Sequence, residues 1–150
     1  MFFKKKIYHF ICSVIFIIYL NPACSNSDSS LYLHFDNAYV KLPLIGSDST
    51  SGYANITNRT DYLISVEGIS CSGVSLSSFH ETLVDHMSGS TSMEKIERFK
   101  IFPNKSIKFS PGGKHIMLMG ISEEFTKGDK ITCQIFTDPR GIVKVEFEIQ

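Results

Sequence analysis

Apolar and polar residues alternate with a period of two along much of the chain after residue 30. A period of two places alternate side chains on opposite faces of a β-strand. The same alternation recurs at Tyr62, Ile64 and Val66, and no segment shows a convincing helical period. The clearest case is at the C-terminus, where Val143, Val145, Phe147 and Ile149 alternate with Lys144, Glu146 and Glu148. The pattern predicts an all-β protein.

Gly, Pro, Asn and Asp interrupt these alternations at intervals of about ten residues, the spacing of short strands joined by turns. Eight or nine strands at this spacing predict a single Greek-key β-sandwich domain without internal repeats. Besides the segments above, the expected strands are Ala38 to Leu42, Gly52 to Thr57, Val74 to His80, Ile96 to Phe99, Ser106 to Phe109, Lys114 to Ile121 and Lys130 to Thr137.

The expected strand Lys114 to Ile121 follows a turn at Pro111-Gly112-Gly113 and carries an unusual set of side chains. Its alternation places His115, Met117 and Met119 on one face. Ile116 and Leu118 take the opposite face, which we expect to pack in the core. One strand therefore presents an imidazole beside thioether groups.

Two further residues of the same chemistry precede this strand. His80 ends the apolar stretch that begins at Val74, and Met93 follows in a segment that reads as a polar loop. A hairpin-type return would bring both to the strand that holds His115 and Met117. Thioether sulfur is a soft, uncharged donor that suits Cu(I) and binds Zn(II), Mg(II) or Ca(II) poorly. We therefore predict a copper(I) site formed by His80, Met93, His115 and Met117.

These residues resemble the motif of the PCu(A)C family of periplasmic copper chaperones. That motif is a His, a Met about a dozen residues later, 21 residues, and then His-x-Met. Here 21 residues separate Met93 from His115, and Met117 completes the His-x-Met. His80 precedes Met93 by a slightly longer gap of 12 residues, and the pair His86-Met87 lies within that gap. The resemblance covers roughly Asp36 to Ile149.

The resemblance implies a cupredoxin-like β-sandwich that carries copper(I) and supplies it for cytochrome c oxidase assembly. The implied partners are the copper ion and a copper-receiving protein, such as a cytochrome c oxidase subunit or another copper chaperone. Met119 lies one step beyond the motif, and we place it at the lip of the site. His86 and Met87 are either exposed loop residues or a weaker, auxiliary copper-acquiring pair.

Other functions fit the same residues less well. A zinc protease helix motif starting at His80 would need a second His where Val84 stands. A zinc site from His80, His86 and His115 with Glu81 or Asp85 stays open but leaves the methionines without a role. A blue-copper site needs a Cys thiolate near its His ligands, and neither Cys71 nor Cys133 has a His-rich neighbourhood.

No nucleophile motif is present, so we expect no enzymatic activity. The alternative function is a metal-free, exported β-sandwich that binds another protein.

The N-terminus has the character of a secretory signal peptide. Lys4, Lys5 and Lys6 precede the apolar run Ile7 to Leu20, which at 14 residues is shorter than a membrane-spanning helix. We assign residues 1–23 to a signal peptide or signal anchor, 24–34 to a polar spacer and 35–150 to the copper-chaperone domain. A small residue precedes Cys24, so cleavage there would give either a lipoprotein or an ordinary exported protein. The expected location is the periplasm, free or anchored to the inner or outer membrane.

Charge and cysteine content refine this picture. The chain has 15 basic and 15 acidic residues, and removal of residues 1–23 takes away three lysines, which leaves 12 against 15 and a net charge of −3. This balance does not suggest nucleic-acid binding. Cys71 and Cys133 remain in the predicted domain, where an oxidising compartment would allow them to pair. Cys133 also alternates with Ile131 and Ile135, so a buried free thiol fits equally well.

Overall fold

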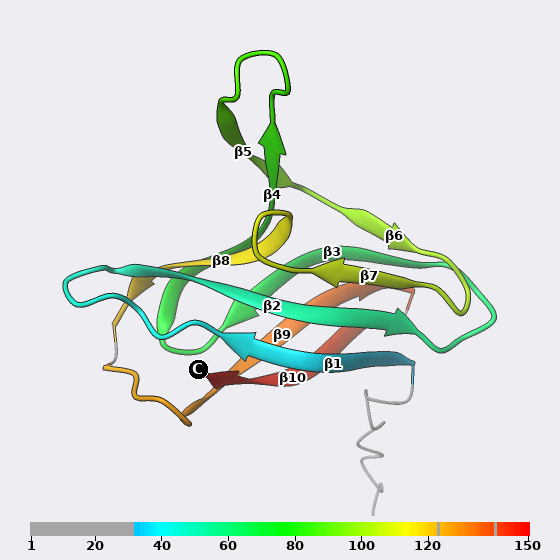
Figure 1. Ribbon diagram of the computed structural model, residues 1–150. Coiled ribbons are helices and arrows are strands. Elements are labelled where there is room, and N and C mark those ends of the chain that lie inside the picture. The colour runs from blue at the N-terminus through cyan, green and yellow to red at the C-terminus, as the bar shows by residue number, and fades with distance from the viewer. Residues whose placement is uncertain (1–31, 123, 140) are drawn as a thin grey trace, which may run out of the picture.

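A computed structural model describes residues 32–122, 124–139 and 141–150. The predicted signal peptide, Cys12, Cys24 and most of the spacer lie outside these residues. The secondary-structure elements of the described residues are all β-strands, which confirms the all-β prediction (Figure 1). The strands are β1 (Leu33–Val40), β2 (Ser49–Asn58), β3 (Ile64–Cys71), β4 (Val74–Val84), β5 (Thr91–Ile96), β6 (Phe99–Ile101), β7 (Ser106–Phe109), β8 (Lys114–Ile121), β9 (Lys130–Asp138) and β10 (Gly141–Ile149).

The strands form one continuous hydrogen-bonded sheet, which folds back on itself into two layers. Their order is β5-β4-β8-β2-β1-β10-β9-β3-β6, and β7 pairs with β2 beyond the end of its pairing with β8. Strand β1 joins the two halves, because it is antiparallel to β2 and parallel to β10. Figure 1 shows the layer that contains β2 and β8 lying over the layer that contains β9 and β10. Among the described residues, no helix has the length and apolar character that a membrane span requires.

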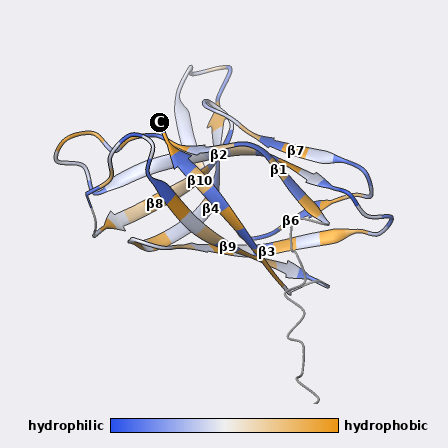
Figure 2. Ribbon diagram, turned by 90° about the horizontal axis from the view of Figure 1, so that it is seen from below, coloured by the Kyte–Doolittle hydropathy of each residue, from blue (hydrophilic) through white to orange (hydrophobic). Residues whose placement is uncertain are grey.

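The core lies between the two layers and is built from the predicted alternation. Strand β9 alternates strictly between exposed and buried residues, and Ile131, Cys133 and Ile135 are buried. Figure 2 shows the apolar and polar residues alternating along the strands. Phe79, Phe99 and Phe109 form an aromatic cluster with ring centroids 5.1 to 5.5 Å apart. Burial of Phe79 contributes about 2–3 kcal/mol, and it fixes which face of β4 turns away from the core.

Several strand boundaries differ from the sequence prediction. The expected strand Ile96 to Phe99 is wrong, because Ile96 ends β5 and Phe99 begins β6. Met93 lies within β5 and not in the predicted loop. The sequence did not indicate this strand, because all but the last residue of β5 are exposed and no apolar alternation marks it. Strand β1 begins at Leu33, five residues before the expected start. A register shift between Asp36 and Tyr39, where Asn37 has a φ of 51°, interrupts the alternation of this strand. A β-bulge of this kind moves the following side chains to the other face and hides the strand from a period-two search.

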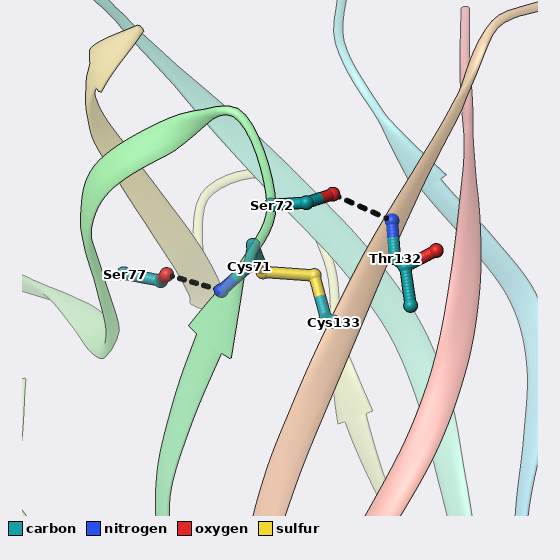
Figure 3. Close-up of a disulfide and its surroundings, with 5 residues drawn as sticks. All are labelled: Cys71, Ser72, Ser77, Thr132 and Cys133. Atoms are coloured by element: carbon teal, nitrogen blue, oxygen red, sulfur yellow. Dashed lines mark hydrogen bonds between the residues drawn. A yellow bond between two sulfur atoms is a disulfide. The ribbon is translucent and has the colours of Figure 1, made fainter. Parts of the chain in front are cut away.

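Cys71 and Cys133 form a disulfide, which settles the two alternatives that the sequence left open. The two residues are direct partners on neighbouring strands β3 and β9. Figure 3 shows the adjoining hydrogen bonds: Ser77 Oγ accepts from the Cys71 amide at 3.0 Å, and Ser72 Oγ accepts from the Thr132 amide at 3.3 Å. The disulfide therefore joins β3 to β9 just before the chain turns into β4. It also leaves neither sulfur as a free thiolate, which removes the blue-copper alternative.

Asn58 closes the turn after β2 and is expected to be important for stability. Its side chain is 0% exposed, and its amide nitrogen donates to the carbonyls of Tyr62 and Ile101 at 2.7 and 3.0 Å. Its Oδ1 accepts from the Thr60 amide and hydroxyl at 2.9 and 2.7 Å. Asn58→Ala should lower the free energy of unfolding by about 2–3 kcal/mol, because it removes the four hydrogen bonds of a buried amide, among them the bond to the carbonyl of the buried Ile101.

Urea denaturation of Asn58→Ala beside Asn55→Ala would test this expectation. Asn55 lies on the same strand but is only half-buried. A loss of equal size in the two variants would contradict a specific role for Asn58.

Candidate metal centre

The two predicted histidine ligands lie opposite each other on neighbouring strands. Strands β4 and β8 are antiparallel, and their register pairs His80 with His115 and Phe79 with Ile116. Phe79 and Ile116 pack in the core, so alternation turns both imidazoles to the other face of the sheet. The ring centroids of His80 and His115 are 5.9 Å apart, with an angle of 32° between the ring planes.

Met93 reaches the same face from the next strand. The β4–β5 hairpin, which projects from the sandwich in Figure 1, pairs Thr82 with Met93, so Met93 shares a face with Thr82 and His80. Its Sδ lies 3.2 Å from His115 Nε2, although β4 runs between their strands. Met93 is 57% exposed, whereas His115 is only 6% exposed. The thioether therefore covers a buried imidazole from the solvent side.

Met117 is the fourth predicted ligand and is half-buried on β8. It lies two residues after His115, hence on the same face, and pairs with Ser78 of β4 and Ser51 of β2. The structure thus brings all four predicted residues to one face of the adjacent strands β5, β4 and β8. Met119 is one step further along this face, opposite Leu76.

His86 and Met87 lie away from this cluster. They belong to the tip of the hairpin, beyond the last β4–β5 pair of Val84 with Thr91, and Met87 is 98% exposed. The Asp85 carboxylate accepts hydrogen bonds from the Ser88 hydroxyl and the Met87 amide, which lower the pKa of Asp85. Asp85 is thus engaged in closing the turn.

His115 presents a lone pair to the Met93 sulfur. Its Nδ1 is 3.0 Å from the carbonyl oxygen of Gly113, and a carbonyl can only accept, so Nδ1 carries the proton. In the neutral ring, the lone pair of Nε2 then points at Met93 Sδ. This sulfur also carries lone pairs and has no proton to donate. Two electron-pair donors 3.2 Å apart, with no proton between them, form an arrangement that a soft cation would stabilise.

His80 is held differently. Its Nε2 is 2.9 Å from the hydroxyl oxygen of Ser78, while its Nδ1 is the one buried side-chain nitrogen or oxygen in the described residues that lacks a hydrogen-bond partner. Burial lowers the pKa of His80, and the nearby charges of His115 and Lys95 lower it further. The fold therefore favours a neutral imidazole, the form that can bind a metal.

The zinc alternative is not supported by the geometry. Glu81 forms an ion pair with Lys114, its partner across β4 and β8, and Asp85 is engaged in the hairpin turn. Within residues 32–122, 124–139 and 141–150, no three His, Cys, Asp or Glu side chains come together as a metal site.

Sequence reasoning missed two neighbours of the site, Ser78 and Lys95. Both flank His80 on its own face: Ser78 is two residues earlier on β4, and Lys95 is the partner of His80 on β5. Alternation along β4 could have indicated Ser78, since residues i and i−2 share a face. Lys95 required the register of a strand whose side chains are almost all exposed.

The chain is similar to known proteins both in sequence and in structure. A sequence model of the family described as "LpqE-like: Putative lipoprotein LpqE-like" matches residues 33–149. The "Putative lipoprotein Lxx21020" of Leifsonia xyli subsp. xyli (strain CTCB07) is 31% identical over 94 residues. Those residues are 62% of this chain and 56% of that protein, so the match spans little more than half of the relative.

Several solved structures have the same fold. The copper-bound PCuAC domain from PmoF2 superposes with a TM-score of 0.64 at 17% identity, covering 79% of this chain and 92% of that one. The apo PCuAC domain from PmoF1 gives 0.63 at 17% identity, with 79% and 93% covered. The solution structure of CuI-DR1885 from Deinococcus radiodurans gives 0.58 at 18% identity, with 76% and 75% covered. The predicted cupredoxin-like β-sandwich is confirmed.

Proposed function

The chain belongs to the LpqE-like family and has the fold of PCuAC domains, and we propose that it is an exported chaperone for copper(I). In this proposal His80, Met93, His115 and Met117 bind the ion, and the protein then delivers it to a partner. The observation that carries the proposal is the contact between His115 Nε2 and Met93 Sδ, with the His80 ring beside it.

The donor set favours copper(I) over other biological cations. Two neutral imidazoles and two thioethers add no negative charge to the site, so a bound monovalent ion would keep its charge of +1. Harder divalent ions gain little from thioether sulfur. Two proteins with the same fold support this choice, because the PCuAC domain from PmoF2 is described as copper-bound and DR1885 from Deinococcus radiodurans as bound to Cu(I).

The unequal exposure of the ligands suits transfer. Met93 lies on a projecting hairpin and is largely exposed, whereas His115 is buried. A partner's ligand could replace Met93 first while the imidazoles still hold the ion, so exchange would proceed one ligand at a time. From the resemblance to PCu(A)C proteins, we propose a cytochrome c oxidase subunit or another copper chaperone as the recipient. Periplasmic location, with membrane attachment through a lipid on Cys24, belongs to the same proposal.

Anaerobic titration of Cu(I) against a chromogenic chelator tests the proposed function. Ascorbate should serve as the reductant, because a thiol would open the disulfide and bind copper itself. Cys12 and Cys24 should be replaced by serine in every protein, since free thiolates also bind Cu(I). We expect one Cu(I) per chain, without displacement by an excess of Zn(II). Absence of binding would discard the copper site and favour the metal-free interaction module.

The lowered pKa of His80 predicts how the apo protein responds to acid. By NMR, the His80 ring should titrate with a midpoint below 6.5, its ordinary value. Lys95→Met should raise this midpoint, because it removes one of the positive charges that disfavour the imidazolium. Lys100→Met, an exposed change on β6, should not. A midpoint at or above 6.5 in the unmodified protein would contradict the expectation.

The same shift has a defined sign for stability and for copper binding. In unfolded chains His80 takes up its proton near pH 6.5, and in the folded protein it does so at lower pH. The unfolding free energy should therefore fall as pH decreases below 6.5 and level off once the folded pKa is passed. Protonation of His80 should also begin to weaken copper binding only below pH 6.5.

A further inference from the structure

The ligating nitrogen of each histidine follows from what its other nitrogen contacts. A neutral imidazole has one N–H group and one lone pair, and only the lone pair can bind a metal. A metal-bound histidine keeps its N–H, which is almost always donated to an acceptor nearby. The acceptors beside His80 and His115 therefore decide which nitrogen of each ring is left for the ion.

For His115 the acceptor is the carbonyl oxygen of Gly113, 3.0 Å from Nδ1. Gly113 ends the turn that precedes β8, so its carbonyl is held by the backbone close to the ring. With the proton on Nδ1, the lone pair is on Nε2, the atom that contacts Met93 Sδ. His115 is thus set to bind through Nε2.

For His80 the polar partner is the hydroxyl of Ser78, 2.9 Å from Nε2. Nδ1 is buried and has no partner. Copper on Nε2 would displace Ser78 and place an N–H on Nδ1, where this structure offers no acceptor. Copper on Nδ1 would keep the Ser78 contact, with Nε2–H donating to the hydroxyl oxygen. The second arrangement satisfies the ring and the first does not.

We propose that Ser78 is a positioning residue: its hydroxyl accepts the Nε2–H of His80 and leaves Nδ1 as the copper ligand, whereas Gly113 leaves Nε2 of His115. The two imidazoles then bind through different nitrogens because their acceptors contact different ring atoms. This inference rests on the proposed function. It adds Ser78, which orients His80, to Gly113, which orients His115. Burial and the neighbouring charges of His115 and Lys95 lower the pKa of His80 and so favour the neutral ring, whose tautomer the Ser78 contact sets.

Variants at position 78 give the first test. Ser78→Ala removes the acceptor, and Cu(I) affinity should fall about tenfold, the usual effect of losing a group that orients a metal ligand. Ser78→Thr keeps a hydroxyl and should restore the affinity to within about threefold. Thr82→Val is the matched control and should keep the parent affinity, because Thr82 follows His80 by two residues on the same face of β4, and its hydroxyl has no part in the proposal. Unchanged affinity in Ser78→Ala would overturn the inference.

Nitrogen NMR of histidine-labelled protein gives a readout that a purely structural role would not change. Cu(I) is diamagnetic, so spectra of the loaded protein can be recorded directly. On loading, we expect the copper-induced shift of His80 at Nδ1 with Nε2 still protonated, and the reverse for His115. A copper-induced shift at His80 Nε2 would overturn the inference but leave the proposed function standing. No change in either ring on addition of Cu(I) would overturn the proposed function itself.

Discussion

Replacing Met93 and Met117 together by leucine is expected to weaken Cu(I) binding about 100-fold or more, since the change removes both soft sulfur donors. Leucine has nearly the volume of methionine, so packing is largely kept and the unfolding free energy should change by less than about 1.5 kcal/mol. Met93 is largely exposed and Met117 half-buried, so neither holds the core together. Competition titration measures the affinity, and urea denaturation of the same samples measures stability.

The chain supplies two matched controls for this double variant. Met87→Leu changes a methionine at the hairpin tip, and Met119→Leu changes one on the same face of β8 but one step beyond Met117. Each should keep Cu(I) affinity within about threefold, because a residue that does not ligate removes no bond to the ion. Equal losses from all the methionine changes would mean that thioethers act nonspecifically, and full affinity in the double variant would remove Met93 and Met117 from the site.

Alternation along a single strand was enough to predict half of the candidate site. The turn at Pro111 and the alternation of β8 gave the strand its observed bounds, with Ile116 in the core and His115 on the other face. A local pattern decides these features, because each residue's face depends only on its neighbours along the chain. The position of Met117 relative to His115 follows from the same rule.

The other half of the site depends on contacts that are distant in sequence. His80 is opposite His115 because β4 pairs with β8 in one register, and a shift of one residue would have turned His80 into the core. Periodicity gives no register between strands 35 residues apart. His80 and Met93 were therefore assigned to this site from their ligand chemistry, an expected hairpin-type return and the resemblance to PCu(A)C proteins, and not from a derived register. Strand β5 was missed for a related reason: an exposed edge strand needs no apolar face. Ser78 was missed because nothing in the sequence distinguishes it from the other serines until its contact with His80 is known.

The sequence was limited in the same way for the disulfide. Alternation correctly placed Cys133 on a core face, but its pairing with Cys71 depends on the register of β3 with β9. Replacing Cys71 and Cys133 by alanine is expected to lower the unfolding free energy by about 4 kcal/mol, because the bond closes a loop with a sequence separation of 62 residues and restricts the unfolded chain. For a domain of this size the melting temperature should fall by roughly 10–20 °C. Calorimetry of the variant and of the parent protein measures both quantities.

A thiol reductant separates the effect of the bond from that of the two sulfur atoms. It should destabilise the parent protein by a similar amount but leave the double alanine variant unchanged, because that variant, with Cys12 and Cys24 also replaced by serine, has no cysteine left. The disulfide joins β3 to β9, whereas the proposed ligands lie on β4, β5 and β8, so Cu(I) affinity measured well below the melting temperature should stay within about threefold of the parent. A variant that kept its stability but lost copper would instead show that this disulfide orients β4, through the Ser77 hydroxyl that accepts from the Cys71 amide.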